Sequence, residues 1–148
     1  MTEIHRRLDA IIRELKCTGA LSRVRFVREY ASEYAETPVR HLLAAVCVTR
    51  TVRERGYFGG LLSPSVRGES YGVTAEIRVY APSGGNGTGL SEIVSELLAA
   101  LEKADAEKLI VSAAASSIEF DADLNAIFRR VTLEMSFCVS GEAEYDRV

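Results

Sequence analysis

The chain has 148 residues, of which 47% are hydrophobic and 26% charged, a size and composition typical of one globular domain. It has no apolar run of the roughly 20 residues that span a bilayer and no apolar core of a secretory signal, which indicates a cytoplasmic protein. The net charge of −3 is uneven, since residues 1–80 hold 13 Lys and Arg against 9 Asp and Glu, whereas residues 81–148 hold 5 against 12. These opposite halves, +4 and −7, either pair head to tail between copies or simply solvate separate faces.

The first predicted element is a helix over about residues 2–17. Its apolar residues recur at the spacing of one helical face: Ile4, Leu8, Ile11, Ile12 and Leu15. The dipeptide Thr18-Gly19 predicts the end of this helix, with Gly19 in the left-handed conformation of a C-cap.

Alternating and β-branched residues then predict three strands, over residues 22–30, 39–55 and 71–81. In the second strand, Val46, Val48 and Val52 are expected to share one face, which Arg50 interrupts. The third strand is expected to carry four residues opposite its apolar face: Thr74, Glu76, Arg78 and Tyr80.

Two long connections separate the predicted elements. The segment GYFGGLLSPSVRGES, residues 56–70, is apolar for a loop and is predicted to be a contact surface, because loops of this length are commonly functional. The segment PSGGNGTG, residues 82–89, is predicted to be a flexible loop. A second helix follows over residues 90–104, with Thr88 or Ser91 as its N-cap.

Two strands, over residues 108–120 and 126–140, follow the second helix. The short link DADLN between them predicts an antiparallel hairpin, and the polar tail at residues 141–148 is expected to fray. In the last strand, four residues are expected opposite the apolar face: Arg130, Thr132, Glu134 and Ser136. The fold class that follows is a single α+β domain, with a mainly antiparallel sheet, two helices packed on one face and the order α-β-β-β-α-β-β.

The glycine-rich loop is the first candidate for binding chemistry. It follows a strand and opens a helix, as a phosphate-binding loop does. However, no Lys or Arg occurs between Arg78 and Lys103, and the GxGxxG pattern is absent. A small ligand- or nucleotide-binding domain that uses residues 82–89 is therefore the alternative to a structural role.

The catalytic and metal-binding patterns in the sequence are no more specific than the pattern of the glycine-rich loop. The three cysteines lack CxxC spacing and the chain has only two histidines, which argues against a zinc site. No GxSxG nucleophile elbow is present, and an enzyme centred on His41 and Cys47 is the third hypothesis. A carboxylate cluster either binds a divalent cation or, as we favour, keeps a hairpin tip in water: Glu119, Asp121 and Asp123.

Two arginine-rich stretches lie in predicted strands: Arg23, Arg25 and Arg28, and then Arg50, Arg53 and Arg55. Arginines in such stretches contact nucleic-acid phosphates in some proteins. Here glutamates stand beside both stretches and no recognised nucleic-acid motif is present. We therefore interpret them as forming ion pairs between proteins or lining the lumen of a ring.

Four features together resemble the tail-terminator proteins of long-tailed bacteriophages and prophages. They are the opening helix TEIHRRLDAIIREL, the loop GYFGGLLSPSVRGES between long strands, the strand TAEIRVYAP leading through a glycine-rich loop into the helix LSEIVSELLAALEKA, and the return strand NAIFRRVTLEMSFCVSGE with its arginine pair. The resemblance covers most of the chain.

The resemblance implies a structural protein of the virion tail, not an enzyme, that is assembled in the cytoplasm of the bacterial host. Subunits of that family form a hexameric ring that caps the tail tube and joins it to the head connector. The implied partners are other copies of the chain, the tail-tube protein and head-completion or connector proteins, without a cofactor, a metal, a membrane or sequence-specific nucleic acid. The residues expected at subunit or partner contacts are Arg50, Arg53, Arg55, Tyr57, Phe58, Leu61, Leu62, Gly84, Gly85, Asn86 and Gly87.

Overall fold

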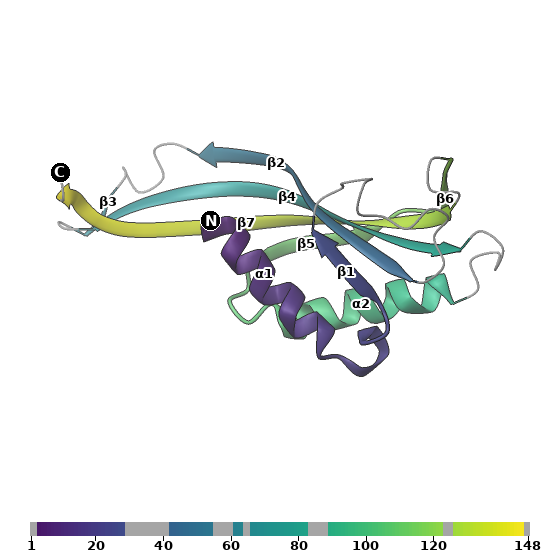
Figure 1. Cartoon of the computed structure of the whole chain (residues 1–148). Coiled ribbons are helices and arrows are strands. Elements are labelled where there is room, and N and C mark those ends of the chain that lie inside the picture. Colours follow the sequence, from purple (N-terminus) through teal and green to yellow (C-terminus); the bar gives the residue numbers. More distant parts are fainter. Residues whose placement is uncertain are drawn as a thin grey trace.

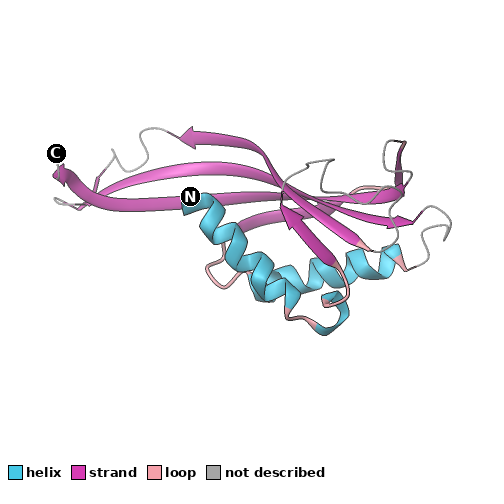
Figure 2. Cartoon of the chain, viewed as in Figure 1, coloured by secondary structure: helices cyan, strands magenta, loops and turns pink. Residues whose placement is uncertain are grey.

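The computed structural model describes residues 3–28, 42–54, 61–63, 66–82, 89–122 and 126–146. Within these ranges, two α-helices lie on one face of a seven-stranded, mainly antiparallel sheet (Figures 1 and 2). The predicted α+β fold class is confirmed, and the long elements follow the predicted order.

The helices of the described residues are α1 (Glu3–Lys16) and α2 (Leu90–Ala104), with a short 3-10 turn at Gly19–Leu21. The strands of the described ranges are β1 (Arg25–Arg28), β2 (Leu43–Glu54), β3 (Leu61–Ser63), β4 (Val66–Pro82), β5 (Ile110–Ala115), β6 (Glu119–Asp121) and β7 (Ala126–Asp146).

The main strands lie in the order β1-β2-β4-β7-β5, with β3 paired to β4 and β6 paired to β7. β1 runs parallel to β2, and every other pair is antiparallel. β4 and β7 pair from Val66 and Glu142 at one end to Pro82 and Ala126 at the other. They form a long ribbon that extends beyond the helices (Figure 1).

The main hydrophobic core fills the space between the helices and the sheet. Leu15 of α1, Leu90 of α2 and Phe137 of β7 are fully buried there. Burying apolar side chains of this size stabilises a fold by roughly 1.5–3 kcal/mol each. Since both helices contribute to this core, they leave the opposite face of the sheet to other contacts.

The ends of the helices differ in detail from the prediction. α2 begins after Gly89, whose φ of 83° is left-handed, and the Gly89 carbonyl accepts the N–H of Ile93 at 3.0 Å. Neither proposed N-cap is the observed one, since Ser91 lies inside α2 and Thr88 lies outside the described residues. Gly19 is not left-handed, because the chain continues from α1 into the 3-10 turn.

Two predicted irregular segments contain regular strand, which corrects the prediction. Within the predicted loop at residues 56–70, residues 61–63 form β3 and residues 66–70 begin β4. The tail does not fray from residue 141, because β7 continues to Asp146 and pairs with β4 through Glu142. Backbone hydrogen bonds between two long neighbouring strands extend each strand irrespective of side-chain polarity, which is why a polar sequence did not end β7.

The residues of β2 also do not alternate strictly between the two faces of the sheet. The register with β4 shifts between Val48 and Arg50, so that Thr49 is an extra residue in a β-bulge. Val48 pairs with the core residue Ala75, whereas Arg50 pairs with Thr74 on the other face. The bulge therefore moves Arg50 out of the core face that it was predicted to interrupt.

Candidate functional site

The described helices cover only one face of the sheet (Figure 2). The opposite face, called here the helix-free face, is polar over its central strands. Strand alternation against the buried core residues assigns its members: Cys47 and Arg50 of β2, Thr74, Glu76 and Arg78 of β4, Arg130, Thr132 and Glu134 of β7, Ser112 and Ala114 of β5, and Glu119 of β6.

An ion-pair cluster occupies the middle of the helix-free face. The Arg78 Nε donates a hydrogen bond to Glu76 Oε1 at 2.8 Å. The Arg130 Nε lies 3.5 Å from the same oxygen, close enough for charge pairing although its N–H forms no hydrogen bond. The other end of the Arg130 guanidinium, Nη2, donates to Glu119 Oε1 at 3.3 Å. The cluster thus links β4, β7 and β6.

The cluster fixes strand register more than it adds stability. The Glu76 side chain is 16% exposed and that of Arg130 is 35% exposed, so water screens the charges in part. Ser116 supports the cluster, since its Oγ donates to Glu119 Oε2 at 3.2 Å and accepts the backbone N–H of Arg130 at 2.9 Å. These contacts hold the segment between β5 and β6 against β7.

Two cross-strand rows run over the helix-free face from β2 to β5. In the first row, Arg50 pairs with Thr74, Thr74 with Glu134, and Glu134 with Ser112. The Thr74 Oγ1 donates to Glu134 Oε2 at 3.0 Å. The second row consists of Cys47, Glu76, Thr132 and Ala114. Arg50 and Cys47 therefore lie at the same levels along the strands as Ser112 and Ala114.

A small apolar cluster completes the helix-free face at the other end of β4. Tyr80 is fully buried and its ring lies 5.1 Å from that of Phe128, while the Arg78 guanidinium lies 5.2 Å from the centre of the Phe128 ring. The Tyr80 hydroxyl donates to Asp121 Oδ2 at 3.5 Å. The face therefore has a polar central part and an apolar end.

The predicted contact residues fall into three groups. Arg50 and Arg53 are exposed on β2, with Arg50 on the helix-free face and Arg53 paired to Tyr71 on the other. Leu61 and Leu62 belong to β3. The others lie outside the described residues: Arg55, Tyr57, Phe58, Gly84, Gly85, Asn86 and Gly87.

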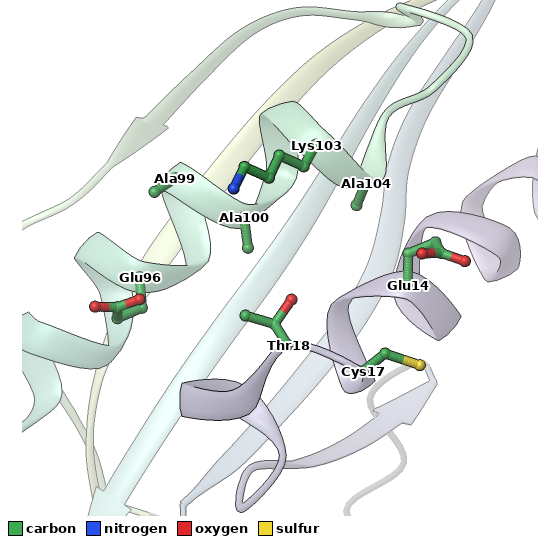
Figure 3. A pocket seen from close by; sticks show the side chains of 8 residues that line it. All are labelled: Glu14, Cys17, Thr18, Glu96, Ala99, Ala100, Lys103 and Ala104. Atoms are coloured by element: carbon green, nitrogen blue, oxygen red, sulfur yellow. The ribbon is translucent and has the colours of Figure 1, made fainter.

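A groove of about 340 Å³ lies between the end of α1 and α2 (Figure 3). Its lining combines small alanines with Glu14, Cys17, Glu96 and Lys103. Cys17 is exposed and immediately follows Lys16, the last residue of α1, and His5 stands about 18 Å away at the other end of the helix by the rise of 1.5 Å per residue. The groove therefore does not combine this thiol with the histidine of the same helix.

The other residues considered for catalysis or metal binding make ordinary ion pairs and hydrogen bonds where the structure describes them. Glu119 pairs with Arg130, Asp121 accepts the Tyr80 hydroxyl, and Asp123 and His41 lie outside the described ranges. The described residues contain no group of three or more His, Cys, Asp or Glu placed to hold a metal ion. The Cys47 Sγ lies 3.6 Å from the Val48 carbonyl oxygen, as expected of a partly buried free thiol.

No model of a known protein family matches the chain, and no curated protein is significantly similar to it. Among the described helices, none is both long and apolar enough to cross a membrane. The functional interpretation therefore depends on the geometry of the sheet.

Sequence reasoning identified the polar sides of β4 and β7 but missed the ion-pair cluster and the two rows. Alternation assigns each polar residue to a face and gives no register between strands. The ion-pair cluster follows from the register of β4 with β7, whereas the row through Arg50 also depends on the bulge at Thr49.

Proposed function

We propose that the protein is a structural subunit that assembles with copies of itself into a closed ring, as in the tail terminators of long-tailed phages. The observation that carries the proposal is the helix-free face, a polar sheet surface held in register by partly buried ion pairs. In the ring this face lines the channel, and the two helices lie outside.

The chemistry of the helix-free face supports this role. A sheet normally buries one face against a core and leaves the other to water or to a partner. Arg50, Arg78 and Arg130 are mixed with Glu76 and Glu134 there, so charges of both signs share the surface. A channel with mixed charge attracts a polyanion less strongly than a basic channel, which suits passage without tight binding.

The division of charge along the chain supports heterologous assembly. Residues 1–80 carry a balance of +4 and residues 81–148 a balance of −7. A contact between unlike surfaces of successive copies generates a ring when its rotation closes. The phage resemblance suggests the details of this proposal. They are a ring of six copies, the tail-tube protein and a head connector as partners, and a place in the virion tail.

Size-exclusion chromatography with light scattering, followed by negative-stain electron microscopy, tests the proposal. We expect closed rings of one stoichiometry at high protein concentration. The double variant Arg50→Glu, Arg53→Glu should assemble less while unfolding at nearly the same urea concentration, because each exposed charge change shifts stability by about 0.5 kcal/mol or less. A strict monomer at every concentration would rule the proposal out.

A further inference from the structure

The edge of the sheet formed by β5 and β6 is open and apolar. The two strands follow one another along the same side of β7, and β5 is the last strand of the main order (Figure 1). Residues 111–114 are all exposed. Of the four large hydrophobic side chains that are exposed in the described part of the chain, three lie on this edge: Val111 at 71%, Ile118 at 51% and Phe120 at 59%. An open edge beside exposed apolar side chains is a template for pairing with another chain.

The sequence of this edge lacks the usual chemical protection against such pairing. From Leu109 to Ile118 the chain contains no charged residue and no proline. Natural edge strands commonly carry lysine, proline or an inward-pointing charge to block pairing. We interpret this edge as one that is covered when the protein assembles.

Two irregularities divide the edge and leave one regular segment between them. The register with β7 shifts at Val111. It shifts again where residues 116–118 stand opposite only residues 129–130 of β7. Because the N–H of Ser116 still donates to a β7 carbonyl at 2.8 Å, the regular segment between the two shifts is residues 112–116. Another strand can therefore pair without distortion along these five residues.

The regular segment directs backbone hydrogen-bonding groups away from the sheet on alternate residues. In an antiparallel edge strand, every second residue directs its N–H and C=O toward the neighbouring strand, and the residues between direct theirs outward. The N–H of Ser116 points inward to β7, so the outward groups of the segment belong to Ala113 and Ala115. These two residues lie symmetrically about Ala114, the middle residue of the segment.

The sequence of this edge reads almost the same in both directions about Ala114. Residues 110–118 are IVSAAASSI, in which each residue matches its counterpart on the other side of Ala114, except for Val111 and Ser117. The two register shifts also lie on opposite sides of Ala114. When two identical strands pair about a two-fold axis, each residue faces its counterpart in the other copy, so a symmetric sequence makes the edge self-complementary.

We propose that the occupant of this edge is the same edge of a second copy of the chain, related by a two-fold axis at Ala114. Ala113 of each copy exchanges backbone hydrogen bonds with Ala115 of the other copy. Both residues lie on the helix side of β5, opposite the core residues Leu133 and Val131, and opposed residues of an antiparallel pair share a face. The contact goes beyond the ring proposed above and does not depend on it, since an isologous contact closes at two copies.

The pairing covers the apolar part of the edge and leaves charges in water. At each end of the regular segment, Ile110 and Val111 of one copy come level with Ser117 and Ile118 of the other. The exposed side chains of Val111 and Ile118 therefore leave water together, which favours association. The edge is uncharged from Leu109 to Ile118, so the contact does not require a charged side chain to lose its water.

The same edge of a second copy fits this site better than the β2 edge does. Residues 43–46 of β2 already pair with β1, so the β2 edge of another copy cannot lie along the full length of β5 and β6. The β5 edge has no such obstruction, because residues 111–114, 117, 118 and 120 are all exposed. A strand of an unrelated protein would gain nothing from the symmetry of the sequence about Ala114.

Charge substitution at Ala114 tests the two-fold axis directly, because this residue faces itself across the contact. Ala114→Glu and Ala114→Lys each oppose like charges, and each should raise the dimer dissociation constant, measured by sedimentation velocity, by about tenfold or more. An equimolar mixture of the two variants should dimerise at least as tightly as wild type, and native mass spectrometry should show the mixed dimer. Ala114 is exposed, so the urea midpoint of the dilute chain should change little. Ala10→Glu, at an exposed position of α1, is the control and should dimerise like wild type.

Disulfide trapping tests the register in a chain whose three native cysteines are replaced by serine. Ala114→Cys should link to itself on mild oxidation, because opposed residues of antiparallel strands have Cα atoms about 4.5–5.5 Å apart, within the range that a disulfide spans. Ala113→Cys should not link to itself, because diagonal neighbours are about 7–8 Å apart. It should link to Ala115→Cys when the two chains are mixed. Self-linking of Ala113→Cys in place of Ala114→Cys would overturn the proposed axis.

The outcomes separate this contact from the ring. If Ala114→Glu dimerises as tightly as wild type, or if the mixture of the two charged variants stays monomeric, the two-fold contact is wrong. Wild-type dimers that never form rings would support this contact and remove the ring proposal. Rings that persist in Ala114→Glu, without a cross-link in Ala114→Cys, would remove this contact and leave the ring. A wild-type chain that is monomeric at every concentration would remove both.

Discussion

The carboxylate of Asp105 accepts a hydrogen bond from the backbone N–H of Leu109, with Oδ1 2.8 Å from the nitrogen. Its other oxygen, Oδ2, accepts the N–H of Ile110, also at 2.8 Å. Asp105 is buried immediately after α2, so this one side chain fixes the path of the chain into β5. Because β5 is an edge of the sheet, Asp105 also fixes the position of that edge.

Asp105→Ala is expected to lower the free energy of unfolding by about 2 kcal/mol, because two backbone donors near the core lose their acceptor. Asp105→Asn retains one carbonyl acceptor and should lose less. Urea unfolding followed by circular dichroism measures both variants. A loss below about 0.5 kcal/mol for Asp105→Ala, the size of an ordinary surface change, would show that the turn does not depend on this carboxylate.

Lys108, in the same turn, has a left-handed backbone with φ of 57°. This conformation costs most L-residues roughly 1–2 kcal/mol, whereas glycine adopts it freely. Lys108→Gly should therefore raise the free energy of unfolding, by up to about 1 kcal/mol after the larger entropy of the unfolded glycine chain is subtracted. Lys108→Ala keeps the Cβ and serves as the matched control, for which thermal unfolding should give no gain. A Lys108→Gly variant with a lower free energy of unfolding than wild type would contradict backbone strain at Lys108.

Two phenylalanines at opposite extremes of exposure test the position of the core. Phe137 of β7 is fully buried, and Phe137→Ala should lower stability by about 3–5 kcal/mol. Phe120 of β6 is 59% exposed, and Phe120→Ala should change the stability of the dilute, unassembled chain by about 0.5 kcal/mol or less. Denaturant midpoints at low protein concentration compare them. Similar losses for both variants would contradict the placement of the core on the helix side.

The ion-pair cluster predicts a salt-dependent contribution to stability. Arg78 and Arg130 are opposite one another across β4 and β7, and Glu76 lies beside both guanidinium groups. Glu76→Gln leaves two neighbouring positive charges without this carboxylate and should cost about 1 kcal/mol at low ionic strength. Added salt should reduce the loss, because it screens both the lost attraction and the new repulsion.

Glu102→Gln, on the exposed side of α2, is the control for that measurement and should have little effect at any salt concentration. Guanidinium would itself screen the charges, so urea is the denaturant of choice. If the stability lost in Glu76→Gln is the same at low and high salt, the loss comes from packing and not from electrostatics.

The regular part of the fold follows from the sequence because its periodicity is strong. The apolar spacing of α1 and α2 and the alternation in β4 and β7 predict both helices and the polar and apolar sides of the central strands. The end of β7 was not predictable, because Gly141 and Glu142 are held in the strand by pairing with Arg67 and Val66 of β4. Local composition carries no information about such a distant partner.

The candidate site depended even more on non-local structure. The sequence predicts Arg50 as a contact residue on the core face of its strand, and that face is wrong because the bulge at Thr49 has no sequence signal such as a glycine. Small uncharged residues such as Ser112 and Ala114 carry no sequence signal in a strand. Their places in the two rows follow only from the pairing of β5 with β7.

A cryo-electron microscopy reconstruction of the assembled protein tests the central claim most directly. We expect a closed ring in which the helix-free face lines the channel, and α1 and α2 lie outside. A ring with the helices around its channel would contradict this account.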